Sequence, residues 1–343
     1  MTVRIAKPSV NIREKLAELE RPIGLNGQAL LATSTPQEAF DLLGAGRRNL
    51  IINGDFKISQ RGDYSSATAA SNLTYYLDRW KTDISGPSAT IQRQTVTLPD
   101  NSQTYSAKLA ATSTVSNGYL QLQQFVEIFP YMQGRTVTMS AWVRSNRQVR
   151  LRMESTNANF DGLTAHSGSG NWEYITQTFT LVTGLSLLKF GVILWNSSGG
   201  TTGTTTGSNI TSGDYLEFAN YQVEFGKVAT PFEYRSIGEE LALCQRYYQE
   251  VGNGNNGSNE IVEGGYGTNA MPVYNSIQLP VEMRTVPTLS QVGTLYTVNI
   301  GQPVSLSGHV GRKSFSIANI VTSAGTWVYA TNTSAYFTLS AEL

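Results

Sequence analysis

Side chains with oxygen donors are the first candidates for chemistry in this chain. Calcium prefers carboxylate and amide oxygens, and such side chains occur near both ends of a long β-rich region, which a sandwich fold would bring together. The candidate calcium ligands are Asn53, Asp55, Asp214 and Glu217. The alternative is that Asn53-Gly-Asp55 is an ordinary turn. No other cofactor is expected, because one cysteine and two distant histidines cannot supply a typical zinc site.

Aromatic side chains are the second candidates, because flat rings stack on the apolar faces of pyranose sugars. Trp195 precedes a long polar Thr/Gly segment, which favours exposure of its ring. The predicted sugar-contacting residues are Trp195, Tyr119 and Tyr215. Three other tryptophans lie at strand starts or within alternating strands, where core packing is the favoured interpretation, and these are Trp80, Trp142 and Trp172.

Catalytic signatures are weak, so the sequence favours a protein without enzymatic activity. Cys244 has no histidine placed to activate it and is interpreted as a small buried apolar residue. A glycosidase needs only two suitably separated carboxylates, and Asp161, Glu173 and Glu224 are candidates. A glycan-degrading depolymerase therefore stays as an alternative.

The charge balance argues against a nucleic-acid partner. Lysine plus arginine and aspartate plus glutamate each number 25 in the 343 residues, so no net positive field draws in a polyanion. We also expect no membrane insertion, because no run of about 18 apolar residues occurs. Residues 1–8 contain no apolar run that could form a signal peptide, so synthesis in a cytoplasm without export is expected.

Residues 1–48 are predicted to form a short helical segment that docks on a partner. Asn11 and Glu14 have the spacing of a capping box, and Thr35 with Pro36 predicts the start of a second helix. The first helix has a single apolar stripe, which cannot bury itself and needs a packing partner. The predicted docking residues are Ile12, Leu16, Leu19, Phe40 and Leu43. The alternative is a helical hairpin packed on the following domain.

The rest of the chain is predicted to be mainly β. Many short strand-like stretches, bounded by Gly, Asn, Ser or Pro, cover residues 49–235, which favours a sandwich of the jelly-roll type. The clearest are residues 89–98, 118–129, 135–144, 148–155, 172–182, 187–195 and 214–224. Residues 236–343 are predicted to hold a helix from Ser236 and a smaller β-domain with strands at 275–279, 291–299, 314–321 and 326–339. That smaller unit has a modest core, so association would stabilise it.

Several phrases of the sequence resemble the carbohydrate-binding-like jelly-roll modules of bacteriophage tail-fibre and head-fibre proteins. In order, they are Asn49-Leu-Ile-Ile-Asn-Gly-Asp-Phe56, Gln60-Arg-Gly62, Leu77-Asp-Arg-Trp80, Tyr221-Gln-Val-Glu-Phe-Gly226 and Ala229-Thr-Pro-Phe-Glu-Tyr-Arg235. In this resemblance residues 49–56 are the first strand of the module and residues 221–226 its last. Residues 12–19 and 40–48 resemble the N-terminal adaptor of such fibres, and residues 243–249 and 279–288 resemble the C-terminal unit that follows.

The resemblance implies a structural protein of a tailed-phage virion, a fibre or spike subunit. Such a subunit would dock to other virion proteins through residues 1–46, form a homotrimer and project its β-domains toward host-surface glycans. A head-fibre or decoration protein with a mainly structural role is the alternative within this class. The expected location is the virion, after synthesis in the host cytoplasm. The matching phrases mark strand starts and ends, so the resemblance identifies no ligand-binding residue.

Overall fold

The computed structural model describes residues 48–155, 158–194, 209–253, 261–303, 310–331 and 335–343, with the backbone alone for 158–163. From Asn49 to Leu343 these residues belong to one compact unit. The predicted docking residues Ile12, Leu16, Leu19, Phe40 and Leu43 lie outside the described residues, and so does Trp195. In the described part of the chain, no helix is long and apolar enough to cross a membrane.

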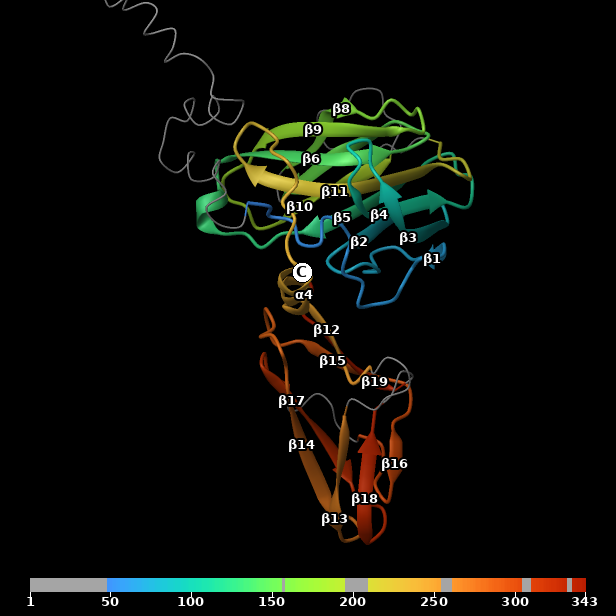
Figure 1. The fold of residues 1–343 in the computed structure, drawn as a ribbon, viewed down its shortest axis with the longest axis vertical. Helices are drawn as coiled ribbons and strands as arrows, with labels where there is room; N and C mark the ends of the chain where they lie inside the picture. The colour runs from blue at the N-terminus through green and yellow to red at the C-terminus, as the bar shows by residue number, and fades with distance from the viewer. Residues whose placement is uncertain (1–47, 156–157, 195–208, 254–260, 304–309, 332–334) are drawn as a thin grey trace, which may run out of the picture. The chain divides into compact units, whose positions relative to one another are not determined.

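Residues 49–235 form an antiparallel β-sandwich, hereafter the sandwich, whose two sheets are visible in Figure 1. The six-stranded sheet has the order β1 (Thr68–Ala70), β3 (Ala89–Thr97), β4 (Gln103–Ala111), β11 (Tyr215–Phe225), β6 (Thr136–Arg144) and β9 (Trp172–Thr180). The five-stranded sheet has the order β2 (Lys81–Ser85), β5 (Tyr119–Phe125), β10 (Leu188–Leu194), β7 (Val149–Ser155) and β8 (Ala158–Ala165). A short 3-10 helix, η1 (Pro130–Met132), lies between β5 and β6. The mainly β prediction is confirmed.

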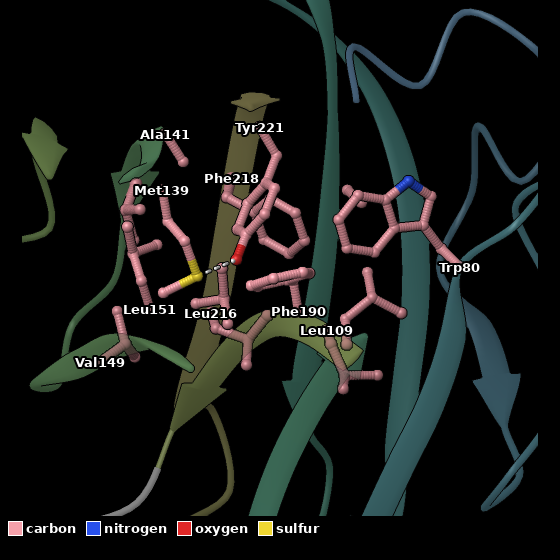
Figure 2. Packing of buried hydrophobic residues seen from close by; sticks show 14 of the residues in the cluster. Trp80, Leu109, Met139, Ala141, Val149, Leu151, Phe190, Leu216, Phe218 and Tyr221 are labelled. Atoms are coloured by element: carbon pink, nitrogen blue, oxygen red, sulfur yellow. Dashed lines mark hydrogen bonds between the residues drawn. The ribbon is translucent and has the colours of Figure 1, made fainter. Parts of the chain in front are cut away.

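The core of the sandwich lies between the two sheets because strand residues alternate between faces. On β6 the predicted inward set, Val137, Met139, Ala141 and Val143, is fully buried. Figure 2 shows Trp80, Phe218 and Tyr221 in this core, and the Trp80 and Phe218 ring centroids are 5.2 Å apart. The Tyr221 hydroxyl on β11 donates to the Gly191 carbonyl on β10 (3.1 Å). A hydrogen bond therefore crosses the core and joins the sheets.

The segment 49–56 is not a strand, so the prediction of a first strand there is wrong. Asn53 and Phe56 have φ angles of 58° and 54°, which lie in the left-handed region and are incompatible with an extended strand. The segment is nevertheless buried and lies beside the last strand, because the Leu50 amide donates to the Val223 carbonyl (2.8 Å). It therefore fills the sandwich as irregular backbone.

Helix α4 (Ile237–Gln245) follows the sandwich, as predicted from the Ser236 capping pattern. The Ser236 side chain accepts a hydrogen bond from the Glu239 amide (3.2 Å), which satisfies one of the free N–H groups of the first turn. Cys244 on this helix is a buried member of a small apolar cluster with Ile52 and Tyr247, which lie outside the helix. Burial raises the pKa of the Cys244 thiol well above its usual value, as expected for an inert structural cysteine.

Residues 248–343 are hereafter the C-terminal β-unit, and those of them that the structure describes form three small antiparallel sheets. The first contains β12 (Tyr248–Val251), β19 (Tyr336–Ser340) and β15 (Thr288–Val292). The second contains β13 (Val262–Gly267), β18 (Gly325–Ala330) and β16 (Tyr296–Val298), and the third pairs β14 (Pro272–Gln278) with β17 (Ser314–Ile320). The predicted strands 291–299 and 326–339 are each two strands, because different parts of each run pair in different sheets.

A buried arginine ties the sandwich to the C-terminal β-unit. The Arg79 guanidinium forms an ion pair with Glu342, donates to the Phe125 carbonyl (2.6 Å) and lies 3.5 Å from the Tyr247 ring centroid. Arg61 pairs with the same Glu342 carboxylate at 2.9 Å. Two residues of the phrases 60–62 and 77–80 thus hold the two parts of the unit together.

Candidate binding surface

The outer face of the six-stranded sheet is divided into a covered half and an open half. Residues 226–235 turn back over the end of β11, where the Thr230 amide donates to Glu224 (2.8 Å) and the Glu233 amide donates to Gln222 (2.8 Å). Gln222 and Glu224 are consequently buried although they point away from the core. The open half, toward the other end of β11, is the part that a ligand can reach.

Four aromatic residues and two cations gather on this open half, which we call the aromatic face. It consists of Trp142, Trp172, Tyr174, Tyr215, Lys108 and Arg144. The strand register places them there, because Trp142 on β6 is opposite both Ala219 on β11 and Tyr174 on β9. The Trp142 and Tyr174 ring centroids are 5.2 Å apart. Tyr174 is 45 % exposed, and both tryptophans are half-buried.

Charged groups hold the aromatic face in place. The Glu217 carboxylate is fully buried and accepts from Arg144 Nη2 (2.7 Å) and from the Ser106 hydroxyl (2.6 Å). Arg144, fixed by that ion pair, lies with its guanidinium carbon 4.8 Å from the Trp172 ring centroid. Lys108 Nζ is 4.4 Å from the Tyr215 ring centroid. Each cation is therefore placed against a ring at cation–π distance, which restricts ring motion.

Two groups near this face have shifted pKa values. A hydrogen bond from the Ser102 hydroxyl (2.6 Å) lowers the pKa of Asp100, in the turn between β3 and β4, so this carboxylate is charged. Burial raises the pKa of Tyr174, so its hydroxyl keeps its proton at neutral pH. The face thus offers half-exposed rings of fixed position beside hydroxyl and charged groups, which is the combination that recognises the apolar and polar sides of a sugar ring.

The structure separates the aromatic residues that the sequence singled out. Trp80 is in the core, as predicted. Core packing was also predicted for Trp142 and Trp172, and this was wrong, because both lie on the outer face. The signal was present in the sequence, since Trp142 is out of phase with the inward set of β6, Val137 to Val143. Tyr215 lies on the aromatic face, whereas Tyr119 lies on the opposite sheet.

The outer face of the five-stranded sheet is polar and its groups satisfy one another. The Tyr119 hydroxyl donates to Asp83 (2.9 Å), and Gln123 donates to the same carboxylate (3.2 Å). Glu154 accepts from Lys189 Nζ (2.7 Å) and Arg152 Nε (2.7 Å). The Tyr119 hydroxyl is thus engaged with Asp83 on this sheet, and Tyr119 does not share a surface with Tyr215 on the other sheet.

The candidate calcium ligands are not assembled into one site. Glu217 is paired with Arg144, Asp214 with Arg147 (2.6 Å), and Asp55 with Lys57 (2.9 Å). The Asn53 side chain is occupied by backbone groups, since its Oδ1 accepts from the Ile58 amide (2.9 Å) and its Nδ2 donates to the Asp78 carbonyl (3.1 Å). Over the described ranges, no group of three or more His, Cys, Asp or Glu residues could hold a metal ion.

The carboxylates proposed for glycoside hydrolysis have structural partners. Glu224 is buried under residues 226–235. Glu173 has a lowered pKa, because hydrogen bonds from Ser167 and Ser169 outweigh the effect of burial. A general acid in such a reaction needs a raised pKa, so Glu173 does not suit that role. The side chain of Asp161 lies outside the described residues.

Ser167 and His166, in the loop before β9, lie beside Glu173 at the start of that strand, but not as a nucleophile and its base. The Ser167 hydroxyl donates to Glu173 and not to the imidazole. His166 Nδ1 accepts from the Gly168 amide (2.9 Å), and Nε2 is 2.9 Å from the Asn171 carbonyl oxygen. The imidazole is therefore occupied by loop backbone and does not activate the serine.

A cavity of about 440 Å³ lies where the end of β5 meets the residues after α4. Its lining is mostly apolar, including Val126, Ile128 and Leu187. The charged groups at its rim are engaged, because Arg246 pairs with Glu127 (3.0 Å). Phe125 also lines the cavity, and Lys81 Nζ and Lys189 Nζ lie 5.2 Å and 5.1 Å from its ring centroid.

No family model matches the chain, and no curated protein matches it. Solved structures with detectable similarity include the enzymatically active domain of bacteriophage CBA120 tailspike protein 4, at 10% identity over 52% of this chain and 21% of that chain, with a TM-score of 0.32. They also include a CBM4 structure (14% identity, 51% of this chain, 98% of that chain, TM-score 0.30). A third is TmCBM61 in complex with β-1,4-galactotriose (12% identity, 52% and 99%, TM-score 0.29). Similarity at this level does not tell what this chain binds.

Proposed function

We propose that this chain is a fibre or spike subunit of a tailed-phage virion and that its aromatic face binds a host-surface glycan. The observation that carries the glycan proposal is the placing of Trp142 and Tyr174 on adjacent strands, half-exposed and with ring centroids 5.2 Å apart, on the open half of the sheet face. A sugar that stacks there covers apolar ring surface, while Arg144 and the neighbouring hydroxyls orient its polar groups. The virion role is supported by the sequence phrases alone.

The test of glycan binding is affinity electrophoresis of the full chain in gels that contain host-surface polysaccharide. Trp142→Ala removes the larger ring, so we expect a loss of roughly tenfold or more in affinity, which corresponds to about 1.4 kcal/mol. The matched control is Tyr131→Ala, which removes a 57 % exposed ring on η1, away from the aromatic face. Equal retardation of Trp142→Ala and the unmodified chain would contradict the proposal.

The same polysaccharide distinguishes a binding protein from a depolymerase. A non-enzymatic subunit retards in the gel without releasing reducing ends. Release of reducing ends that a single Asp or Glu substitution abolishes would replace the proposal with an enzymatic one. Failure to bind any surface polysaccharide, with normal incorporation into particles, would instead favour a structural head-fibre or decoration protein.

The docking part of the proposal is tested by deleting residues 1–46. Since Asn49–Leu343 is a compact unit, we expect the truncated chain to stay folded and soluble but to be absent from purified particles. Circular dichroism checks the fold and immunoblotting of particles checks incorporation. Incorporation at the level of the full chain would show that residues 1–46 do not dock it.

A further inference from the structure

The sheet β13-β18-β16 has apolar residues on both of its faces. On β18, Trp327 and Tyr329 point into the core of the C-terminal β-unit, and Val328 between them points to the other side. A strand that is buried on one side only alternates between apolar and polar residues, whereas a continuous apolar run is typical of a strand that is covered on both sides. The sequence Trp-Val-Tyr-Ala of β18 is of the second kind.

The outward side of this sheet forms an uncharged surface, which we call the neutral face. Strands β13, β18 and β16 are labelled in Figure 1, and their register places eight residues on this side, of which Ala330 is buried. They are Val262, Gly264, Tyr266, Thr326, Val328, Ala330, Tyr296 and Val298. Val262 is 58 %, Tyr266 76 % and Tyr296 59 % exposed. None of these eight residues carries a charge. In the described chain taken alone, several large apolar side chains of one small sheet thus face solvent, which marks an interaction surface.

The neutral face has a different chemistry from the aromatic face. On the aromatic face each of two rings is accompanied by a cation, Arg144 or Lys108, which suits a polar ligand. On the neutral face Val262 and Tyr296 lie on either side of Ala330, Val298 is opposite Val328, and Gly264 leaves the middle of β13 flat. A charged partner would lose hydration of its charges there without gaining an ion pair.

We infer that copies of this chain associate through the neutral face. A second copy presents the same uncharged, flat surface, and identical patches form the closed symmetric contacts that most homo-oligomers use. Burial of the outward valines and tyrosines supplies the driving force, and the tyrosine hydroxyls remain free to hydrogen-bond at the rim. The inference needs neither the glycan proposal nor the virion proposal, because it concerns a different surface.

The test is the molar mass of the full chain over a dilution series, measured by sedimentation equilibrium. We expect the unmodified chain to assemble reversibly and Val262→Lys to weaken association at least tenfold, because the new charge must be desolvated in the contact. Val228→Lys is the matched control, since Val228 is also 58 % exposed but lies in the sandwich, in residues 226–235. We expect it to assemble as the unmodified chain does.

Three outcomes would overturn the inference. They are a monomeric unmodified chain at every concentration, unchanged assembly of Val262→Lys, and equal weakening by both lysine variants. Circular dichroism checks the fold of each variant, and if Val262→Lys is unfolded, Tyr296→Lys on β16 takes its place in the same comparison. Affinity of the monomeric variant for a soluble oligosaccharide is measured separately, so failure of the glycan proposal is distinguishable.

Discussion

The sandwich and the C-terminal β-unit are built from the same kind of antiparallel strand but bury those strands differently. In the sandwich the inner faces of the two sheets form a large core in which Trp80, Phe218 and Tyr221 meet, and the rings of the aromatic face lie outside it beside charged groups. In the C-terminal β-unit the sheets are small, and β13-β18-β16 carries apolar residues on both faces. The difference indicates that the sandwich is complete by itself, whereas the C-terminal β-unit has surface left for a partner.

The largest expected effect is loss of the sandwich core. Trp80 is fully buried, contacts the rings of Phe56, Phe218 and Tyr221, and donates its indole N–H to the Asn53 carbonyl (2.9 Å). Trp80→Ala should therefore lower the free energy of unfolding by about 3 to 5 kcal/mol. Chemical denaturation measures this change. Trp172→Ala, on the outer face, is the control, and a cost as large as that of Trp80→Ala would contradict the division between core and surface.

A smaller effect is expected where the two regions join. Arg79→Met keeps the apolar stem of the side chain but removes a buried partner of Glu342. Because the buried Glu342 carboxylate then keeps only one of its two arginine partners, we expect the free energy of unfolding to fall by about 3 kcal/mol. In calorimetry the sandwich and the C-terminal β-unit should unfold together in the unmodified chain and in separate transitions in the variant. A single unchanged transition would show that Arg79 does not couple the regions.

The smallest effect concerns pH and the polar outer face of the five-stranded sheet. Burial alone would raise the pKa of Glu154, but the hydrogen bond from Lys189 and the charge of Arg152 lower it from 4.5. A lowered pKa in the folded state stabilises the fold fully above the unfolded-state pKa, and this contribution is lost as the pH falls through the folded-state pKa. Glu154→Gln should therefore lower the free energy of unfolding by about 1.5 kcal/mol at pH 7.

The pH dependence of that cost provides the check. The difference in melting temperature between the unmodified chain and Glu154→Gln should shrink as the pH falls below about 4.5. Glu239→Gln, an exposed change in the first turn of α4, is the control. A difference that stays constant down to the acid limit would mean that the ion pairs of Glu154 do not stabilise the sandwich.

Local patterns in the sequence predicted most helices and strands correctly. They failed where strand boundaries depend on which strands pair with each other. The alternation on β6 and the cap at Ser236 depend on near neighbours, and both predictions are confirmed. The segment 49–56 is apolar enough to be a strand, but the left-handed backbone at Asn53 and Phe56 prevents it from pairing as one. Runs 291–299 and 326–339 were divided because their halves pair with different strands, which no local pattern shows.

The sequence by itself determined that the chain is mainly β and where its turns and helix α4 lie, because these follow from short-range sterics and from the period of apolar residues. Only the tertiary structure decided which rings share a surface. Tyr215, Trp142 and Trp172 meet on one face because β11, β6 and β9 are neighbours in the sheet, while Tyr119 lies on the other sheet. Strand order is set by contacts between residues far apart in the chain, and the candidate binding face depends on that order.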